Sequence, residues 1–195
     1  GMMLAFPALM PEALAQTTPV QGLGVNVSGA EYPWETYPIA SHLTYLKNRG
    51  IKFIRLPVAW ERLQPVLGQD LDSYELKRLK SFLLLAASKD IQVIIDLHNY
   101  GRYNPAWKTK GPDGSKSQTD VIGSAAVPVS VYADFWTKLA QELAGQPGLV
   151  GYDIMNEPNH MGSTTIWPEA AQAAVDGIRR VAKKTTLYIE GYQWA

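Results

Sequence analysis

The chain has 195 residues, of which 46% are hydrophobic and 18% are charged, as expected for a globular domain with an apolar core. Its 18 basic and 18 acidic residues give a formal net charge of zero, which argues against a partner such as nucleic acid or an anionic membrane surface. Because the sequence contains no Cys, disulfide scaffolds, thiolate zinc sites and cysteine nucleophiles are excluded. A neutral substrate fits the zero net charge better than a charged partner does. The six Trp and ten Tyr side chains suit surfaces that are part polar and part apolar, such as the faces of sugars.

Residues 1–21 are expected to be a leader that precedes the folded domain. Residues 2–15 are apolar and end in Ala-Leu-Ala, the small-x-small pattern that signal peptidases accept. Two prolines interrupt the run and no basic segment precedes it, so a plain hydrophobic leader is the alternative to a signal-peptide remnant. The run is too short to span a bilayer as a helix. A signal remnant would predict a secreted or periplasmic protein, with residues 22–195 as its domain.

From residue 22 onward, short apolar runs rich in β-branched residues alternate with amphipathic stretches, which is typical of βα units. Five strands are predicted, over residues 23–27, 51–60, 91–100, 149–156 and 186–192. Four helices are predicted between them, over residues 39–49, 72–89, 130–145 and 167–181. Asp72 and Glu75 have capping-box spacing at the start of the second helix. Most strands have apolar residues at consecutive positions, which predicts burial of both faces.

Two α/β architectures accept this order of elements, a doubly wound open sheet and a closed (β/α)8 barrel of the TIM type. No Gly-x-Gly-x-x-Gly turn follows the first strand, where a dinucleotide-binding open sheet would need one. Polar and aromatic residues instead follow each strand, where barrel enzymes place catalytic groups. We therefore predict a TIM-barrel type of fold, truncated to about five strands and four helices. Pairing of two copies through the open sheet edges is the alternative to truncation of a longer enzyme.

The segment Gly-Tyr-Asp-Ile-Met-Asn-Glu-Pro, residues 151–158, places a carboxylate at the end of an apolar strand. The proline is expected to keep Glu157 extended rather than helical, so that its carboxyl group projects at the mouth of the strand. A turn with a capping role is the structural alternative.

Two other predicted strands also end in polar side chains. Arg55 lies within an apolar strand, where an unpaired guanidinium would be very costly, so a carboxylate partner such as Asp96 or Asp153 is expected. The third strand ends in His98, followed by Asn99 and Tyr100. Each of these side chains alone is explained by ordinary core pairing. Three strand ends that carry such groups together indicate a site.

Four ordered motifs resemble glycoside hydrolase family 5, the cellulase-like family: residues 25–29, 54–60, 96–100 and 155–158. The resemblance extends from residue 22 to 194, through a fifth strand that ends near Trp194. It implies a retaining endo-β-glycosidase that hydrolyses a β-glucan, as an endo-β-1,4-glucanase does, without a metal or other cofactor. Carried over to this chain, it makes Glu157 the catalytic acid/base. Asn156 would contact the substrate 2-hydroxyl, Arg55 would order the site, and His98 would line the subsite at the scissile bond.

A retaining mechanism needs a second carboxylate about 5 to 5.5 Å from the first. In the family this nucleophile follows the seventh strand, whereas the chain ends after the fifth predicted one. Asp153 lies four residues before Glu157 and is expected to be too deep in the strand. Glu190, on the adjacent strand, is the best internal candidate, but neutralisation of Arg55, or acceptance of a hydrogen bond from a barrel tyrosine, is the favoured explanation for it. Other acidic residues, Glu61 among them, are expected in rim loops.

Aromatic residues near the strand ends are candidate stacking platforms for sugar rings, with core packing as the alternative for each. They are Trp34 and Tyr37 after the first strand and Trp60 after the second. Asn99, Tyr100 and Trp194 are further candidates for substrate binding. The long stretch after the third strand, residues 101–128, is expected to shape the cleft.

Two other classes of function remain open. One is a catalytically inactive carbohydrate-binding or interaction protein, which the missing nucleophile favours. The other is a metal-dependent hydrolase with ligands drawn from Asp96, His98, Asp153, Glu157 and His160. Their spacing argues against a metal site because no second His is clustered with His98.

Overall fold

The computed structural model describes residues 22–110 and 119–193. The predicted leader, residues 1–21, and Trp194 lie outside the described residues, as does the segment 111–118. Five parallel strands form the main sheet: β1 (Leu23–Asn26), β2 (Ile51–Val58), β3 (Gln92–Leu97), β6 (Leu149–Asp153) and β7 (Thr186–Tyr188). All five predicted strands are confirmed.

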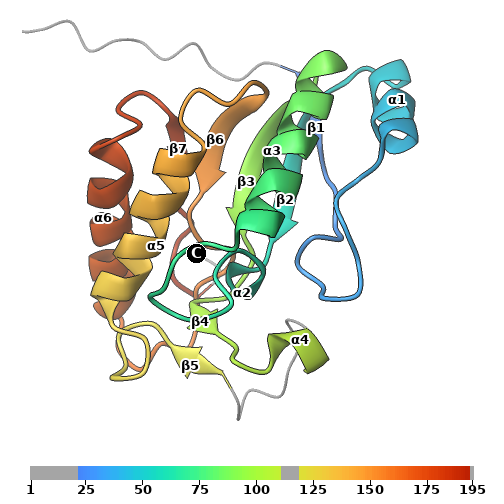
Figure 1. Cartoon of the computed structure of the whole chain (residues 1–195). Helices are drawn as coiled ribbons and strands as arrows, with labels where there is room; N and C mark the ends of the chain where they lie inside the picture. Colours follow the sequence, from blue (N-terminus) through green and yellow to red (C-terminus); the bar gives the residue numbers. More distant parts are fainter. Residues whose placement is uncertain (1–21, 111–118, 194–195) are drawn as a thin grey trace, which may run out of the picture.

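The order of the strands in the sheet is their order in the chain, β1-β2-β3-β6-β7. A doubly wound sheet reverses this order at a switch point, whereas a (β/α) barrel adds each strand beside the preceding one. The winding is therefore that of a barrel. In Figure 1 the arrows of β2, β3 and β6 point toward the end of the sheet where α2, β4 and α4 lie. Because all five strands of the main sheet are parallel, their polar ends meet there.

The four predicted helices are also confirmed, as α1 (Ala40–Asn48), α3 (Ser73–Ser88), α5 (Val129–Glu142) and α6 (Ile166–Arg179). Asp72 caps α3 by accepting a hydrogen bond from the backbone N–H of Glu75 at 2.9 Å, as its spacing predicted. In Figure 1, α3 and α5 lie in front of the strands, with α1 and α6 to either side. Among the described residues, no helix is both long and apolar enough to cross a membrane.

Four short elements near the carboxyl ends of the strands were not predicted. They are the helices α2 (Trp60–Leu63) and α4 (Trp107–Lys110) and the antiparallel pair of strands β4 (Arg102–Tyr103) and β5 (Asp120–Val121). Each is too short for a hydrophobic period to show in the sequence. The expected long loop after β3 is thus partly folded.

Burial differs between the central strands and the edges of the sheet. The core side chains of β2 and β3 are fully buried, as predicted for a sheet covered on both faces. The prediction is wrong for β1, where Leu23 is 66% exposed, because this strand is an edge and pairs only with β2 in the sheet. The same apolar core includes large aromatic side chains, which pack at ring-centroid distances of 5.2–5.6 Å: Trp60, Tyr132, Phe135, Trp136 and Tyr152.

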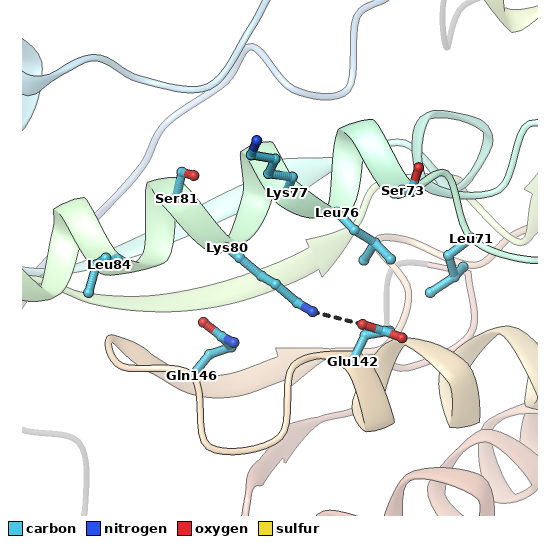
Figure 2. Close-up of a pocket in the computed structure, with 9 residues that line it drawn as sticks. All are labelled: Leu71, Ser73, Leu76, Lys77, Lys80, Ser81, Leu84, Glu142 and Gln146. Atoms are coloured by element: carbon cyan, nitrogen blue, oxygen red, sulfur yellow. Dashed lines mark hydrogen bonds and ion pairs between the residues drawn. The ribbon is translucent and has the colours of Figure 1, made fainter.

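A surface groove runs between α3 and the end of α5, on the outer side of the helices (Figure 2). Leu71, Leu76 and Leu84 line it, and Lys80 Nζ forms an ion pair with Glu142 Oε2 at 2.7 Å across it. None of the residues that line this groove is a predicted site residue. The groove therefore provides a surface for control variants away from the polar strand ends.

Candidate active site

Arg55, on β2, lies at the centre of the polar cluster at the carboxyl ends of the strands. Its Nε atom donates to Asp153 Oδ2 at 2.8 Å, and Nη1 pairs with Asp96 Oδ2 at 2.9 Å. Its Nη2 atom pairs with Glu190 Oε1 at 3.0 Å. The expectation that Arg55 has carboxylate partners is confirmed, and three carboxylates from β3, β6 and the end of β7 share one guanidinium.

Two amide side chains complete the surroundings of the guanidinium. Asn26 Oδ1, on β1, accepts from Arg55 Nη1 at 3.1 Å, and Asn156 Oδ1 accepts from Nη2 at 2.9 Å. Arg55 therefore contacts residues at the ends of all the other strands of the main sheet. Since a guanidinium has no acceptor, the oxygen of the Asn156 amide must face Arg55, and its NH2 group faces away.

The pKa values in the cluster are set by the burial of Asp96 and Asp153 and by the positive charge of Arg55 beside them. Burial raises the pKa of Asp153 to about 7, with a further contribution from Asp96, while Arg55 opposes the shift. Burial also raises the pKa of Asp96, against the effects of His98 and Arg55. Burial alone would lower the pKa of Arg55, but the carboxylates of Asp96 and Asp153 raise it. The guanidinium is therefore permanently charged, and the buried carboxyl groups are the part of the cluster that titrates.

His98 is held by the same cluster. Its Nδ1 atom lies 2.6 Å from Asp96 Oδ2, the oxygen that also pairs with Arg55. Its Nε2 atom lies 3.1 Å from the hydroxyl group of Tyr100, and the two rings are edge to face with centroids 5.2 Å apart. The structure thus brings together three of the predicted residues, Arg55, His98 and Tyr100, through Asp96.

Asn99 is directed away from this group. Its Oδ1 atom accepts from the backbone N–H of Trp60 at 2.8 Å, and its Nδ2 atom donates to both oxygens of Glu61 at 2.9 Å. These contacts give no support to the predicted role of Asn99 in substrate binding. Glu61 itself is 4% exposed, in α2, and the expectation of a rim loop is wrong for it. Burial raises the pKa of Glu61 to about 7, although hydrogen bonds from Asn99 and the N–H of Asn104 oppose this.

Glu157 does not have the extended backbone that was predicted from the following proline. Its φ angle is 42°, in the left-handed region. The rule for residues before proline disfavours the right-handed helical region, but here the backbone is fixed by two side chains. Glu190 Oε2 accepts from the N–H of Glu157 at 2.6 Å, and Asn159 Nδ2 donates to its carbonyl oxygen at 2.8 Å.

Glu190 was the best internal candidate for a second carboxylate. Both of its oxygens accept hydrogen bonds, Oε1 from Arg55 and Oε2 from the N–H of Glu157. The expectation that it neutralises Arg55 is confirmed. Since these donors stabilise the carboxylate and reduce its nucleophilicity, the contacts favour a supporting role.

The aromatic candidates divide into exposed and buried rings. Trp34 is 66% exposed and lies 5.6 Å from the ring of Tyr32. Trp60 is fully buried, with Nε1 donating to Gln64 Oε1 at 2.9 Å, and Tyr37 is also buried. The idea of Trp60 and Tyr37 as stacking platforms is therefore wrong, because neither ring is accessible to a sugar. The sequence shows that an aromatic residue follows a strand but not which way it turns.

The loop that carries Trp34 is held by Arg62 of α2, which sequence reasoning missed. Its Nε atom donates to the carbonyl oxygen of Ala30 at 2.7 Å, and Nη2 donates to those of Tyr32 and Glu35 at 2.6 and 2.9 Å. Arg62 is buried, with only 4% of its side chain exposed. The exposed ring of Trp34 thus stands on a fixed loop.

A parallel sheet wound in chain order, with carboxylate and amide groups gathered at the carboxyl ends of its strands, is the arrangement found in (β/α)-barrel glycoside hydrolases. The model of the cellulase family, glycosyl hydrolase family 5, matches residues 14–195, and the chain belongs to this family. The family resemblance and the predicted fold class are confirmed.

Similar proteins agree on this assignment. The chain is 27% identical over 183 residues to the manganese dependent endoglucanase Eg5A of Phanerodontia chrysosporium, a match that covers 88% of this chain and 44% of that protein. It is 42% identical, with a TM-score of 0.78, to the crystal structure of endoglucanase Cel5A of Pseudomonas stutzeri in complex with cellobiose, over 89% of this chain and 51% of the other. For XacCel5A in complex with cellopentaose, the identity is 34% and the TM-score 0.75, over 89% and 53%. The chain spans about half the length of these proteins.

The name of the first of these relatives, Eg5A of Phanerodontia chrysosporium, describes that protein as manganese dependent. Within residues 22–110 and 119–193, no group of three or more His, Asp or Glu side chains is arranged to hold a metal ion. Asp96 and His98, which the metal-hydrolase alternative requires as ligands, are bonded to each other and to Arg55 and Tyr100. These residues therefore do not fit a metal site.

Proposed function

We propose that the domain, residues 22–195, carries the acid/base part of the active site of a retaining endo-β-1,4-glucanase, with Glu157 as the acid/base. The observation that carries this proposal is the fixed geometry around Glu157. Its backbone N–H donates a hydrogen bond to the Glu190 carboxylate, and that carboxylate also accepts a hydrogen bond from Arg55. A catalytic carboxyl group needs such a fixed direction relative to the glycosidic oxygen. Support also comes from the family and from the endoglucanases that the chain resembles.

In this proposal Glu157 donates its proton to the glycosidic oxygen as the bond from that oxygen to the anomeric carbon breaks. A second carboxylate attacks the anomeric carbon and forms a covalent glycosyl intermediate. Glu157 then removes a proton from the water that hydrolyses the glycosyl intermediate. The described carboxylates next to it, Asp153 and Glu190, are both bonded to Arg55. The nucleophile is therefore assigned to neither of them.

The neighbouring residues have distinct proposed roles. Asn156 is oriented by Arg55 so that its NH2 group is available to the 2-hydroxyl of the sugar. His98 and Tyr100 form a polar wall beside the scissile bond. Trp34 offers an exposed ring for stacking on a sugar further along the chain. Asn99 and Trp194 are candidates only because they lie near the ends of the third and fifth predicted strands.

A β-1,4-linked glucan is the proposed substrate. Two similar proteins were crystallised with cellobiose and cellopentaose, which supports gluco-oligosaccharide binding by this chain. The apolar leader pattern at residues 2–15 supports a secreted or periplasmic location.

The test is release of reducing ends from cellopentaose by the unmodified chain, by Glu157→Gln and by Glu169→Gln. Glu169 is an exposed carboxylate in the first turn of α6, so it is a matched control. We expect the Glu157 variant to lose about 10²–10⁴-fold in kcat and the control to keep its activity. Equal turnover by Glu157→Gln would remove the proposed role of that residue.

The second candidate is a carbohydrate-binding protein without turnover, favoured by the pairing of both neighbouring carboxylates, Asp153 and Glu190, with Arg55. It predicts that cellopentaose binds, as measured by titration calorimetry, while no reducing ends appear. Turnover that depends on Glu157 would exclude it.

A further inference from the structure

Residues with an unusual backbone gather at the carboxyl ends of the strands. Of the five described non-glycine residues with a positive φ angle, Tyr100, Glu157 and Gln193, at 55°, 42° and 57°, each follow a different strand of the main sheet. His160 lies in the loop after Glu157, and Asp90 precedes β3. A residue with a Cβ atom enters this left-handed region at an energetic cost. The surrounding contacts must therefore stabilise it, and such residues often mark positions that need a particular direction.

For Glu157 the stabilising contact comes from 33 residues later in the chain. Glu190 Oε2 accepts from the N–H of Glu157 at 2.6 Å, a short hydrogen bond of the kind that a carboxylate makes. The other oxygen, Oε1, accepts from Arg55 Nη2 at 3.0 Å. One carboxylate thus joins the partly buried guanidinium of Arg55 to the backbone of the proposed acid/base.

Glu190 is itself held in place by α6. Trp167 Nε1 donates to the carbonyl oxygen of Glu190 at 2.8 Å, and Trp167 is buried at the start of that helix. The backbone of Glu190 is therefore tied to a helix while its side chain bonds in two directions. A carboxylate that served only as a counterion for Arg55 would not require the second contact.

We propose that Glu190 is a positioning residue for Glu157. It holds the N–H of Glu157 and so keeps the backbone at a positive φ, from which the Glu157 side chain is directed into the site. Glu190 takes no proton and forms no covalent bond in this role. The catalytic meaning of the inference rests on the proposed function of Glu157, whereas the hydrogen bond can be tested without it.

The main variant is Glu190→Gln, which keeps the size of the side chain. Two donors, Arg55 Nη2 and the N–H of Glu157, converge on the carboxylate, but an amide has one acceptor oxygen. One donor must then face the NH2 group. The control is Glu142→Gln, which also removes one carboxylate from an ion pair, in the outer groove of Figure 2.

The measurement is amide hydrogen exchange at Glu157 by NMR. We expect the protection of this amide to fall by about 10-fold or more in Glu190→Gln, since a hydrogen bond to a charged group is lost, and to stay unchanged in the control. The loss should recur when Glu157→Gln is the background, because the contact is to the backbone. Unchanged protection of residue 157 in a folded Glu190→Gln protein would overturn the inference.

The unmodified chain gives a second measurement that needs no folded variant. An amide proton in a short hydrogen bond to a carboxylate resonates downfield, so the Glu157 amide proton should lie downfield of those of exposed loop residues. A resonance at the position of a solvent-exposed amide would contradict the inference.

Activity separates this inference from the proposed function. If the chain turns over cellopentaose, Glu190→Gln should lower kcat by about 10-fold or more with KM nearly unchanged, because Glu190 bonds to Arg55 and the backbone. Turnover with an unaltered kcat would refute the positioning role while leaving Glu157 as the acid/base. Lost amide protection in a chain that shows no turnover would support the contact and favour binding without turnover as the function of this chain.

Discussion

Arg55 and Asp153, which are 98 residues apart in the sequence, meet with Arg55 Nε 2.8 Å from Asp153 Oδ2. The contact joins β2 to β6 across the intervening strand β3. Burial raises the pKa of Asp153 to about 7 even with the guanidinium beside it. Removal of that cation would leave two almost fully buried carboxyl groups, those of Asp96 and Asp153, without a charged partner. The centre of the site is therefore also a point on which the stability of the sheet depends.

We expect Arg55→Met to lower the free energy of unfolding by about 3–5 kcal/mol, since breaking a buried ion pair leaves uncompensated polar groups. Urea unfolding followed by circular dichroism measures it. Arg180→Met is the control, because Arg180 is exposed at the end of α6 and should change stability by no more than about 0.5 kcal/mol. Similar stability of the two variants would show that the carboxyl groups of the cluster are neutral in the folded protein.

Glu61 predicts a particular dependence of stability on pH. Burial raises its pKa from 4.5 to about 7, so the folded state holds the proton more tightly than the unfolded state. The resulting stabilisation is fully present below pH 4.5 and is lost as the pH rises through 7. Because each pKa unit corresponds to about 1.4 kcal/mol, the loss amounts to roughly 3 kcal/mol at most.

The measurement compares unfolding free energies of the unmodified chain and Glu61→Gln between pH 4.5 and 8. Glu61→Gln lacks the titrating group, so the unmodified chain should lose stability relative to it as the pH rises, with no further change above about pH 8. Glu142→Gln serves as the control for the loss of one carboxylate. A difference that is constant across the range would mean that the three hydrogen bonds to Glu61 keep it ionised throughout.

Much of the fold was predictable because the spacing of apolar residues along the sequence determines where the long helices and strands form. The four long helices and five strands of the sheet each show such a spacing, and the capping of α3 by Asp72 depends on residues three apart. The backbone of Glu157 was not predictable in this way. The N–H of Glu157 donates to Glu190, which follows β7, and the local rule for residues before proline carries no information about that contact.

The same limit applies to side chains whose direction is set by tertiary packing. Trp34 and Trp60 both follow strands in aromatic-rich segments, yet one is 66% exposed and the other fully buried. Glu61 neighbours Trp60 and is buried because Asn99 and the N–H of Asn104 supply its hydrogen bonds. Sequence identifies which residue types gather at the strand ends, while the contacts between loops decide which of them reach the site.

The two tryptophans should separate binding from stability. Trp34→Ala should weaken cellopentaose binding by about 1 kcal/mol or more, through loss of an apolar stacking surface, and leave the unfolding free energy within about 0.5 kcal/mol. Trp60→Ala should cost about 3–5 kcal/mol of stability, because it empties a packed position against Tyr103 and Phe135. Calorimetric titration and urea unfolding of both variants measure this. Unchanged binding in Trp34→Ala would remove that residue from the substrate path.

Gly148 and Gly145 test how tightly β6, the strand that leads to Glu157, is fixed against α3. Both glycines have positive φ angles, 82° and 72°, so an alanine is strained at either position. At Gly148 a Cβ atom would lie 2.6 Å from the carbonyl oxygen of Leu83 in α3, whereas at Gly145 it would meet nothing within 4 Å. The carbonyl oxygen of Gly148 also accepts from the N–H of Val93 at 2.7 Å, which sets the start of β6 beside β3.

Gly145→Ala should therefore cost about 1–2 kcal/mol, from the backbone conformation alone. Gly148→Ala should cost clearly more, by at least about 1 kcal/mol, because the strand must move away from α3. Since Glu157 follows β6, that movement should also shift the amide resonance of Glu157 in Gly148→Ala but not in Gly145→Ala. Equal costs in urea unfolding, with no shift at Glu157, would mean that the start of β6 adjusts without moving the end of the strand.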